Sequence, residues 1–342
     1  MKKGKHRKRI AFFPYKSQNA YIVNIQRILE KYAALIPYEH KKSAFSAIWK
    51  SSCIFLNWYE NELTAMDRFT LLLGRVLQKK IVWTFHNVLP HSGEIKKGRN
   101  DLYFMCRVST DIILLSHASR KELARLVGNR SGILKKAVYI PHINYCNNYL
   151  PEKCDVAPLT DDSFVFLYFG NIRPYKNLEM LIRTFHDLKD RNAVLVIAGN
   201  PVNVQYAKKI KSLCEGNRRI RLDFQYIPDC KVFDYMQTAD VVVLPYDKRS
   251  SMNSGAMIAA FSCRKPVIIP DIAMARDYVD KAYVYQYHYR SEKEHETKLK
   301  ETMIKAYEAG RKQNLSLGAD AYREVKLYNS AQIIQQKLLE IL

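Results

Sequence analysis

The sequence predicts an α/β protein with two doubly wound parallel sheets, and three observations support this fold class. The chain has 342 residues, which is too long for one ordinary core. In both halves, short apolar runs alternate with amphipathic stretches, a pattern typical of parallel strands joined by crossover helices. Residues 146–163 lack periodicity and contain two prolines, so they indicate a linker. We expect domains at residues 1–150 and 151–325, and a final helix over 326–342 that could pack back on the first domain.

The first half opens with an apolar run at residues 10–15 that we interpret as a strand. A helix is expected next, because apolar residues recur at helical spacing over residues 22–29. Further strand-like runs follow at residues 53–58, 80–85, 111–115 and 137–140. Amphipathic stretches such as 63–77 and 119–127 separate most of these runs, which is the order expected of a parallel sheet with helices on both faces.

Histidines follow several of these runs, where a doubly wound sheet binds its ligands. They are His86, His91, His117 and His142. No HxH or HxxxH spacing with an acidic partner supports a metal site, so we expect no metal. Such histidines are often hydrogen-bonded turn residues, or they reach toward phosphate or sugar hydroxyls. His86 is the candidate for chemistry, because its turn, residues 84–87, lies centrally in the inferred sheet.

The second half is organised around residues 164–189. A compact apolar strand at 164–169 leads into a turn at 170–177, and a helix with one apolar face follows. The turn carries Arg173 and Lys176, and it lies where ligands bind at the carboxyl end of parallel strands. Helix N-terminal amides favour an anion there, and the two cations add charge-assisted bonds, so we expect a diphosphate. The alternative is that both cations are solvated surface charges.

The alternation of strands and helices then continues. Strands are expected at residues 193–198, 219–227, 240–244 and 265–269. Between the last two, the mostly small and polar residues 249–255 open a helix over 256–262. Amides at this helix start, around Asn253, Ser254 and Gly255, can form a second anion site. The alternative is ordinary helix capping by Ser254.

The charge balance favours anionic partners. Fifty-five Lys and Arg against 33 Asp and Glu give a formal net charge of +22, which suits nucleic acid, phosphorylated substrates or an anionic membrane surface. Residues 2–9 hold six cations and no acid, which favours an anionic leaflet, although such a segment could equally be a solubilising tail. There is no RRM, zinc, helix-turn-helix or dsRBD signature, so nucleic acid is not the expected partner.

Three further features bear on the compartment. No apolar run approaches the roughly 18–20 residues of a membrane span. The basic start is not followed by the apolar stretch of a secretory signal. The seven cysteines are scattered without a CxxC pair, which favours a reducing compartment. We therefore expect a cytoplasmic protein, peripheral on the inner face of the cell membrane.

Several motifs taken together resemble the C-terminal domain of GT-B glycosyltransferases of the family 4-like group. They are the Gly-x5-Lys turn from Gly170 to Lys176, the pair Ala198-Gly199, and residues 239–246 and 265–268. In the first half, residues 83–91 resemble the T-x-H-N-x-x-P-H turn of bacterial surface-polysaccharide enzymes, including β-mannosyltransferase-like ones. The resemblance implies two Rossmann-like domains facing each other across a cleft. It also implies a nucleotide diphosphate sugar held mainly by the second domain, and an acceptor bound by the first.

The resemblance also implies roles for single residues. The donor site comprises Gly170, Arg173, Lys176, Ile227, Asn253, Ser254 and Gly255. In that site Arg173 and Lys176 grip the diphosphate and act in catalysis, Ser254 and Gly255 offer backbone amides, and Ile227 lies near the nucleobase. If the reaction inverts configuration, His86 is the expected base and Glu94 the second choice. If it retains configuration, the leaving phosphate can take the proton, and His86 would orient the sugar.

The chain departs from the family at one place, since Ser251 and Ala259 stand where the family usually has the two carboxylates of Glu-x7-Glu. The donor sugar and the stereochemical outcome therefore stay open. We expect a metal-independent hexosyltransferase without a cofactor, which moves mannose or a related hexose from a nucleotide diphosphate sugar to a saccharide. That acceptor is expected to be polyprenyl-diphosphate-linked, in surface polysaccharide synthesis. The alternatives are a GT-B-fold sugar-nucleotide epimerase and a basic nucleic-acid-binding protein.

Overall fold

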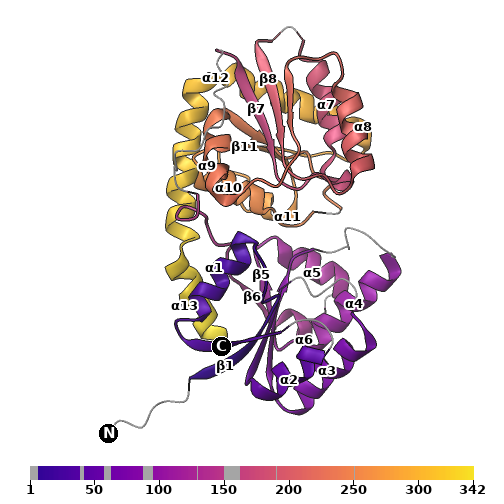
Figure 1. Ribbon diagram of the computed structural model, residues 1–342, viewed down its shortest axis with the longest axis vertical. Helices are drawn as coiled ribbons and strands as arrows, with labels where there is room; N and C mark the ends of the chain where they lie inside the picture. The colour runs from indigo at the N-terminus through magenta and orange to yellow at the C-terminus, as the bar shows by residue number, and fades with distance from the viewer. Residues whose placement is uncertain are drawn as a thin grey trace. The chain divides into compact units, whose positions relative to one another are not determined.

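The computed structural model confirms the α/β class with two parallel sheets (Figure 1). It describes residues 7–38, 42–57, 63–87, 95–128, 130–149, 162–189, 191–249 and 251–342, with the backbone alone for 42–44 and 95–97. The chain divides into unit 1, Met1–Ile143 with Asn329–Leu342, and unit 2, Asn144–Tyr328. The divisions thus fall after residues 143 and 328, not at the expected 150 and 325, because Asn144 and Tyr145 bond to residues of unit 2.

Unit 1 contains a six-stranded parallel sheet in the order β2-β1-β3-β4-β5-β6. Its strands are β1 (Lys8–Phe13), β2 (Ala33–Pro37), β3 (Cys53–Asn57), β4 (Lys80–Phe85), β5 (Asp111–Leu114) and β6 (Ala137–Tyr139). Its helices are α1 (Ala20–Leu29), α2 (Lys42–Lys50), α3 (Ala65–Val76), α4 (Ile95–Val108), α5 (Ser119–Val127), α6 (Ser131–Leu134) and α13 (Ala331–Ile341). The central strands β3 and β4 are buried almost throughout, since helices cover both faces of the sheet.

Unit 2 contains a second six-stranded parallel sheet in the order β12-β11-β10-β7-β8-β9. Its strands are β7 (Phe164–Phe169), β8 (Ala193–Ala198), β9 (Ile220–Asp223), β10 (Val241–Val243), β11 (Val267–Pro270) and β12 (Val284–Tyr287). Its helices are the 3-10 turn η1 (Pro174–Lys176), α7 (Leu178–His186), α8 (Val204–Cys214), α9 (Asp229–Thr238), α10 (Gly255–Ser262), α11 (Ala273–Arg276) and α12 (Glu292–Tyr328). The backbone of α12 is non-helical at Gly310. No helix in the described ranges is long and apolar enough to cross a membrane.

The expected strands are present, but the sequence pattern did not reveal β2 and β12. Both are the outermost strands of their sheets. Three of the five residues of β2 are only half-buried, and β12 includes a half-buried Gln286. An edge strand of this kind has a weak apolar signal, because one side of it is not packed against another strand. The run expected at 219–227 is also shorter in the structure, where β9 ends at Asp223.

The turns after β7 and β8 pack closely against each other. The amide of Gly170 donates to the carbonyl oxygen of Ala198 at 3.0 Å, and both Gly170 (φ 126°) and Gly199 (φ 151°) have positive φ. A Cβ atom on Gly199 would lie 1.9 Å from the carbonyl oxygen of Gly170. Only glycine fits at position 199, and the turn that begins at Gly170 is thereby held in place.

We predict that Gly199→Ala lowers the free energy of unfolding by ~3 kcal/mol or more, because the backbone must move to admit the methyl group. Urea denaturation followed by circular dichroism measures this. Gly132→Ala is the control, since a Cβ there would have no neighbour within 4 Å, and it is expected to cost nothing. Equal midpoints for the two variants would refute the close approach of the two turns.

Candidate functional site

The strand order of unit 2 reverses direction between β7 and β10. From β7 the chain runs outward through β8 and β9, and it then crosses to β10 on the other side of β7. Open parallel sheets bind ligands outside the carboxyl ends of the strands at such a switch point. The turn after β7 and the loop after β10 meet here, and the amide of Asp247 donates to the carbonyl oxygen of Tyr175 at 3.0 Å.

Lys176 lies against aromatic rings at this switch point. Its Nζ is 3.3 Å from the ring centroid of Tyr246, which follows β10, and 5.1 Å from that of Tyr175. A cation–π contact of this kind is worth about 2 kcal/mol when water is excluded. The 3-10 turn η1, which is closed by Asn177 in the left-handed region, carries Lys176 into this position. Lys176 is half-buried against these two rings, which disfavours the alternative that it is a freely solvated surface charge.

The environment of Lys176 favours its neutral form. Burial, followed by the positive charge of Arg173, lowers the pKa of Lys176 from 10.5 to about 7. Among the described residues, no carboxylate forms an ion pair with either cation. A bound anion would supply the missing negative charge and raise the pKa again. Groups with such displaced pKa values in a ligand-binding position are candidates for function.

Tyr246 also contacts the second expected anion site. Ser254 caps α10 by accepting a hydrogen bond from the amide of Met257 at 3.1 Å, and its Oγ donates to the Tyr246 hydroxyl at 3.4 Å. The two anion sites expected from the sequence thus meet at Tyr246. The amide of Ser254 itself donates to Sδ of Met274 at 3.5 Å. Ser254 therefore has the capping role, and its amide, which was expected to contact the diphosphate, is already hydrogen-bonded to Met274.

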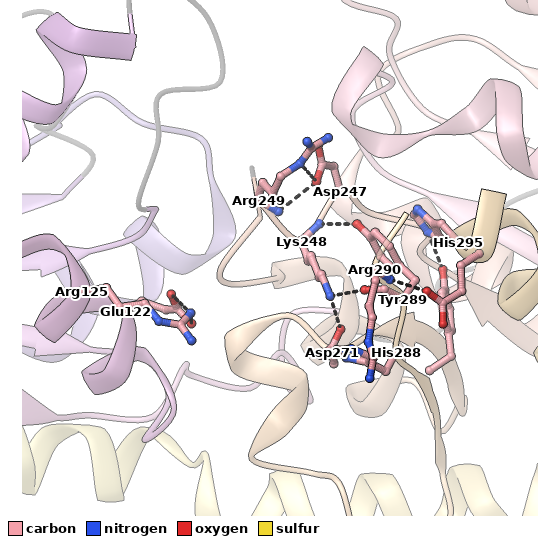
Figure 2. A network of polar contacts seen from close by, with 12 residues as sticks. Glu122, Arg125, Asp247, Lys248, Arg249, Asp271, His288, Tyr289, Arg290 and His295 are labelled. Atoms are coloured by element: carbon pink, nitrogen blue, oxygen red, sulfur yellow. Dashed lines mark hydrogen bonds and ion pairs between the residues drawn. The ribbon is translucent and has the colours of Figure 1, made fainter. Parts of the chain in front are cut away.

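A network of polar contacts holds the loop after β10 to the ends of β11 and β12 (Figure 2). Lys248 forms an ion pair with Asp271 (Nζ to Oδ1, 3.5 Å), and its amide donates to the hydroxyl of Tyr289 at 3.0 Å. Asp271 also contacts Nδ1 of His288 at 2.6 Å. In the same loop the guanidinium of Arg249 makes two hydrogen bonds with the carboxylate of Asp247, each of 3.1 Å. These contacts hold the loop that carries Tyr246 and leads to α10.

The other residues expected in the donor site lie at the same carboxyl edge of the sheet. Gly170 opens the turn after β7, and Asn253 directly precedes the cap of α10. Ile227 is buried in the loop between β9 and α9. In the sheet, strand β8 lies between β9 and β7. Ser251 and Ala259, where the family has carboxylates, are 4% and 3% exposed. A longer acidic side chain at Ala259 would have to be buried inside α10's packed face, which is costly.

In unit 1 the structure surrounds His86 with aromatic side chains. His86 follows β4 and is 6% exposed. Its ring meets that of Tyr21 edge-on, with the centroids 5.6 Å apart, and Tyr21 also lies 4.8 Å from His142. His142, another of the expected histidines, thus belongs to this cluster, whereas His117 packs on Tyr139. His91 and the second-choice base Glu94 lie outside the described residues.

A chain of hydrogen bonds holds the Tyr21 side chain of this cluster in place. The Tyr21 hydroxyl is hydrogen-bonded to Thr84, whose Oγ1 donates to Oδ1 of Asn57 at 3.0 Å. The amide of the Asn57 side chain donates to the carbonyl oxygen of Phe13 at 3.2 Å. The carboxyl ends of β4, β3 and β1 are thereby joined, and Tyr21 is held in one position. Burial raises the pKa of Tyr21, so its hydroxyl stays protonated.

His142 is neutral in this cluster. Burial lowers the pKa of His142 to about 4, which the hydrogen bond with the carbonyl oxygen of Ile143 only partly offsets. Because a carbonyl can only accept, the Nδ1 of His142 carries the proton, at 2.9 Å. Tyr21, the neighbour of His86, is therefore in contact with an uncharged imidazole on His142.

Two residues of these sites, Tyr246 and Tyr21, were not recognised from the sequence. Tyr246 ends the run at 239–246, so its place after a strand was visible. Its contact with Lys176 depends on β10 lying beside β7, which no local pattern reveals. Among the described side chains, no group of three or more His, Cys, Asp and Glu is arranged to hold a metal ion.

Two curated proteins are similar to parts of this chain. Both are named GDP-mannose:glycolipid 4-beta-D-mannosyltransferase and come from Xanthomonas campestris pv. campestris. One is 34% identical over 104 residues, which is 30% of this chain and 29% of that protein. The other is 32% identical over 124 residues, which is 35% of each. The alignments thus span about a third of the length of the curated relatives.

Solved structures match the fold over almost the whole chain. Anabaena HepE, in complex with UDP and glucose, has a TM-score of 0.74 at 13% identity and covers 98% of this chain and 99% of its own. Sucrose-phosphate synthase from Thermosynechococcus elongatus has a TM-score of 0.71 at 14% identity and covers 98% of each chain. The family model described as glycosyl transferases group 1 matches residues 152–324, half of the chain, and includes the switch-point site. This chain therefore belongs to the group 1 glycosyl transferases, with the GT-B fold.

Proposed function

We propose that this protein transfers mannose from GDP-mannose to a saccharide carried on a lipid. The observation on which the proposal mainly rests is the half-buried Lys176, whose Nζ lies against the ring of Tyr246 beside Arg173 and the start of α10, at the switch point of unit 2. Two adjacent cations without a carboxylate partner are suited to a diphosphate, which binds both. The family match supports the transferase class, and the names of the two partial relatives support the sugar and the kind of acceptor.

On the donor side, glycosyl transfer needs the leaving diphosphate to be stabilised as the bond to the sugar breaks. Arg173 and Lys176 would neutralise the charge that develops there, and the amides at the start of α10 would add the positive end of the helix dipole. Tyr246 positions Lys176 before the donor arrives, so little rearrangement is needed. In this proposal the two cations fill the role that a metal ion has in other transferases.

On the acceptor side, we assign His86 the role of base. A β product from an α-linked nucleotide sugar requires inversion, and inversion requires a base to take the proton of the attacking hydroxyl. The acceptor oxygen then bonds to C1 of mannose, the bond from C1 to the diphosphate breaks, and GDP leaves. The Tyr21–Thr84–Asn57 chain would hold His86's aromatic neighbour in place during this step.

The acceptor we propose is a polyprenyl-diphosphate-linked saccharide, on the way to a surface polysaccharide. Such a lipid stays in the membrane, so the enzyme must reach the cytoplasmic leaflet as a peripheral protein. The formal net charge of +22 supports this, because an anionic leaflet attracts basic proteins.

The first prediction concerns donor binding. In a thermal-shift panel of GDP-, UDP- and ADP-sugars, GDP-mannose at ~100 times its Kd is expected to stabilise the protein by about 2.7 kcal/mol. Lys176→Met should weaken binding roughly 10- to 100-fold, because a charge-assisted bond is lost. Lys208→Met, an exposed position on α8, is the matched control and should respond as the parent does. A normal response from Lys176→Met would refute the site.

The second prediction concerns pH. Lys176 has a pKa of about 7 in the free protein, and a bound diphosphate raises it, so binding is strongest below pH 7 and weakens as the pH rises above 7. Above pH 7 the affinity for GDP-mannose should fall by up to about tenfold per pH unit. Calorimetry at pH 8 in buffers of different ionisation enthalpy should show uptake of up to one proton by the parent and none by Lys176→Met. Equal uptake in both proteins would contradict the assignment.

The third prediction concerns transfer. With GDP-mannose and lipid-linked saccharide extracted from membranes, GDP should be released only when the acceptor is present. His86→Gln should lower kcat by roughly 10²–10⁴-fold while the thermal shift with GDP-mannose stays unchanged, and His117→Gln serves as the control. Conversion of the donor sugar without an acceptor would instead indicate an epimerase.

A further inference from the structure

Helix α3 in unit 1 presents its apolar side to solvent. Met66, Phe69, Leu72 and Val76 are 56%, 58%, 51% and 77% exposed. They recur every three or four residues, so they form one stripe along the helix. The residues that face the sheet instead are Asp67, Thr70, Leu71 and Gly74. A helix of an ordinary globular domain has the reverse arrangement, with its apolar stripe buried.

Three contacts hold α3 in this orientation. Thr64 and Asp67 form a capping box at its start, with the amide of Asp67 donating to Oγ1 of Thr64 at 3.1 Å and the amide of Thr64 donating to Asp67 at 3.0 Å. A Cβ on Gly74 would already lie 3.0 Å from Cδ1 of Ile54 on β3. The helix backbone thus packs directly on the sheet at Gly74. Turning the apolar stripe inward would put large side chains where even a methyl group would lie in tight contact with Ile54.

Helix α2 extends this surface. Phe45 and Trp49, one helical turn apart, are 49% and 66% exposed. Helices α2 and α3 pack against each other in unit 1 (Figure 1), where Ile48 of α2 lies near Gly74 of α3. We refer to the six residues Phe45, Trp49, Met66, Phe69, Leu72 and Val76 as the α2–α3 face. Large apolar side chains exposed together on two packed helices indicate an interaction site.

The charges on these two helices are almost all positive. Lys50 and Arg75 are exposed, and Arg68 is half-buried beside Asp101, with which it forms an ion pair. The one acid within α2 and α3 is Asp67, which is buried in the capping box. Two helices that carry exposed apolar side chains and cations, and no exposed acid of their own, match the interface of an anionic bilayer, where rings enter the acyl boundary and cations meet the headgroups. A symmetric contact with a second copy would instead bring like charges together.

We propose that the α2–α3 face docks unit 1 on an anionic lipid bilayer, with its six apolar side chains in the interface and Lys50 and Arg75 against the headgroups. This inference rests on the proposed function for its purpose, since an acceptor held in the membrane must be reached there. Its physical basis is independent of the reaction.

Vesicle flotation of the full-length protein tests the proposal. The parent should bind vesicles of phosphatidylcholine with 30 mol% phosphatidylglycerol at least tenfold more strongly than vesicles of phosphatidylcholine alone. Phe69→Gln with Val76→Gln should reduce binding at least tenfold. The matched control is Val204→Gln with Leu315→Gln, which makes the same change at two exposed positions of unit 2, and it should bind as the parent does. Lys50→Gln with Arg75→Gln should reduce binding tenfold or more, because each cation near the leaflet is worth about 1 kcal/mol.

Two results would overturn the proposal. One is flotation of the Phe69→Gln and Val76→Gln variant like the parent, since the other basic segments would then account for binding. The other is a parent that does not float and is dimeric by light scattering, with the same variant monomeric, since the α2–α3 face would then be an interface between copies. The thermal shift with GDP-mannose separates this test from the proposed function: a failed donor response with intact flotation refutes the donor and leaves the docking surface.

Discussion

Parallel pairing is the constraint on which both sites depend. Every strand pair in the described chain is parallel, so the carboxyl ends of the strands gather at one edge of each sheet. In unit 2 this brings together two turns that are about seventy residues apart in the chain, around Lys176 and Tyr246. In unit 1 it brings together Phe13, Asn57 and Thr84 from three strands. Each site is therefore a property of the sheet and not of any single motif.

The switch point of unit 2 holds a cation in an environment that opposes its charge. Burial and the charge of Arg173 both favour the neutral amine of Lys176, whereas the rings of Tyr246 and Tyr175 favour the ammonium. A protein retains such a group at a cost in stability, because the charged form lacks a counter-ion. In the proposed function, binding of the donor diphosphate would offset that cost. The rigid backbone at Gly170 and Gly199 keeps the turn from relaxing away from this position.

Helix α3 shows a related conflict between local pattern and tertiary position. Its amphipathic pattern is correct for a helix, but the side that packs on the sheet is the side with Thr70 and Gly74. Close packing at Gly74 favours this orientation, since a Cβ there would already be in tight contact with the side chain of Ile54 on β3. The apolar stripe therefore faces solvent. Contact with another apolar phase would remove it from water and lower the free energy. Hydrophobic periodicity alone would have assigned the same stripe to the core.

The sequence by itself determined the fold class, most strand positions, the Gly-x5-Lys turn and the helix start capped by Ser254. These follow from local causes: apolar runs make buried strands, and small residues and cations in strand-to-helix turns favour anions. The edge strands β2 and β12 were missed because their apolar signal is weak. Only the tertiary structure decided that Tyr246 contacts Lys176, that Tyr21 contacts His86, and which face of α3 is buried. Each of those depends on elements that are distant in sequence and become neighbours through the strand order, and a local pattern carries no information about which distant element will lie beside it.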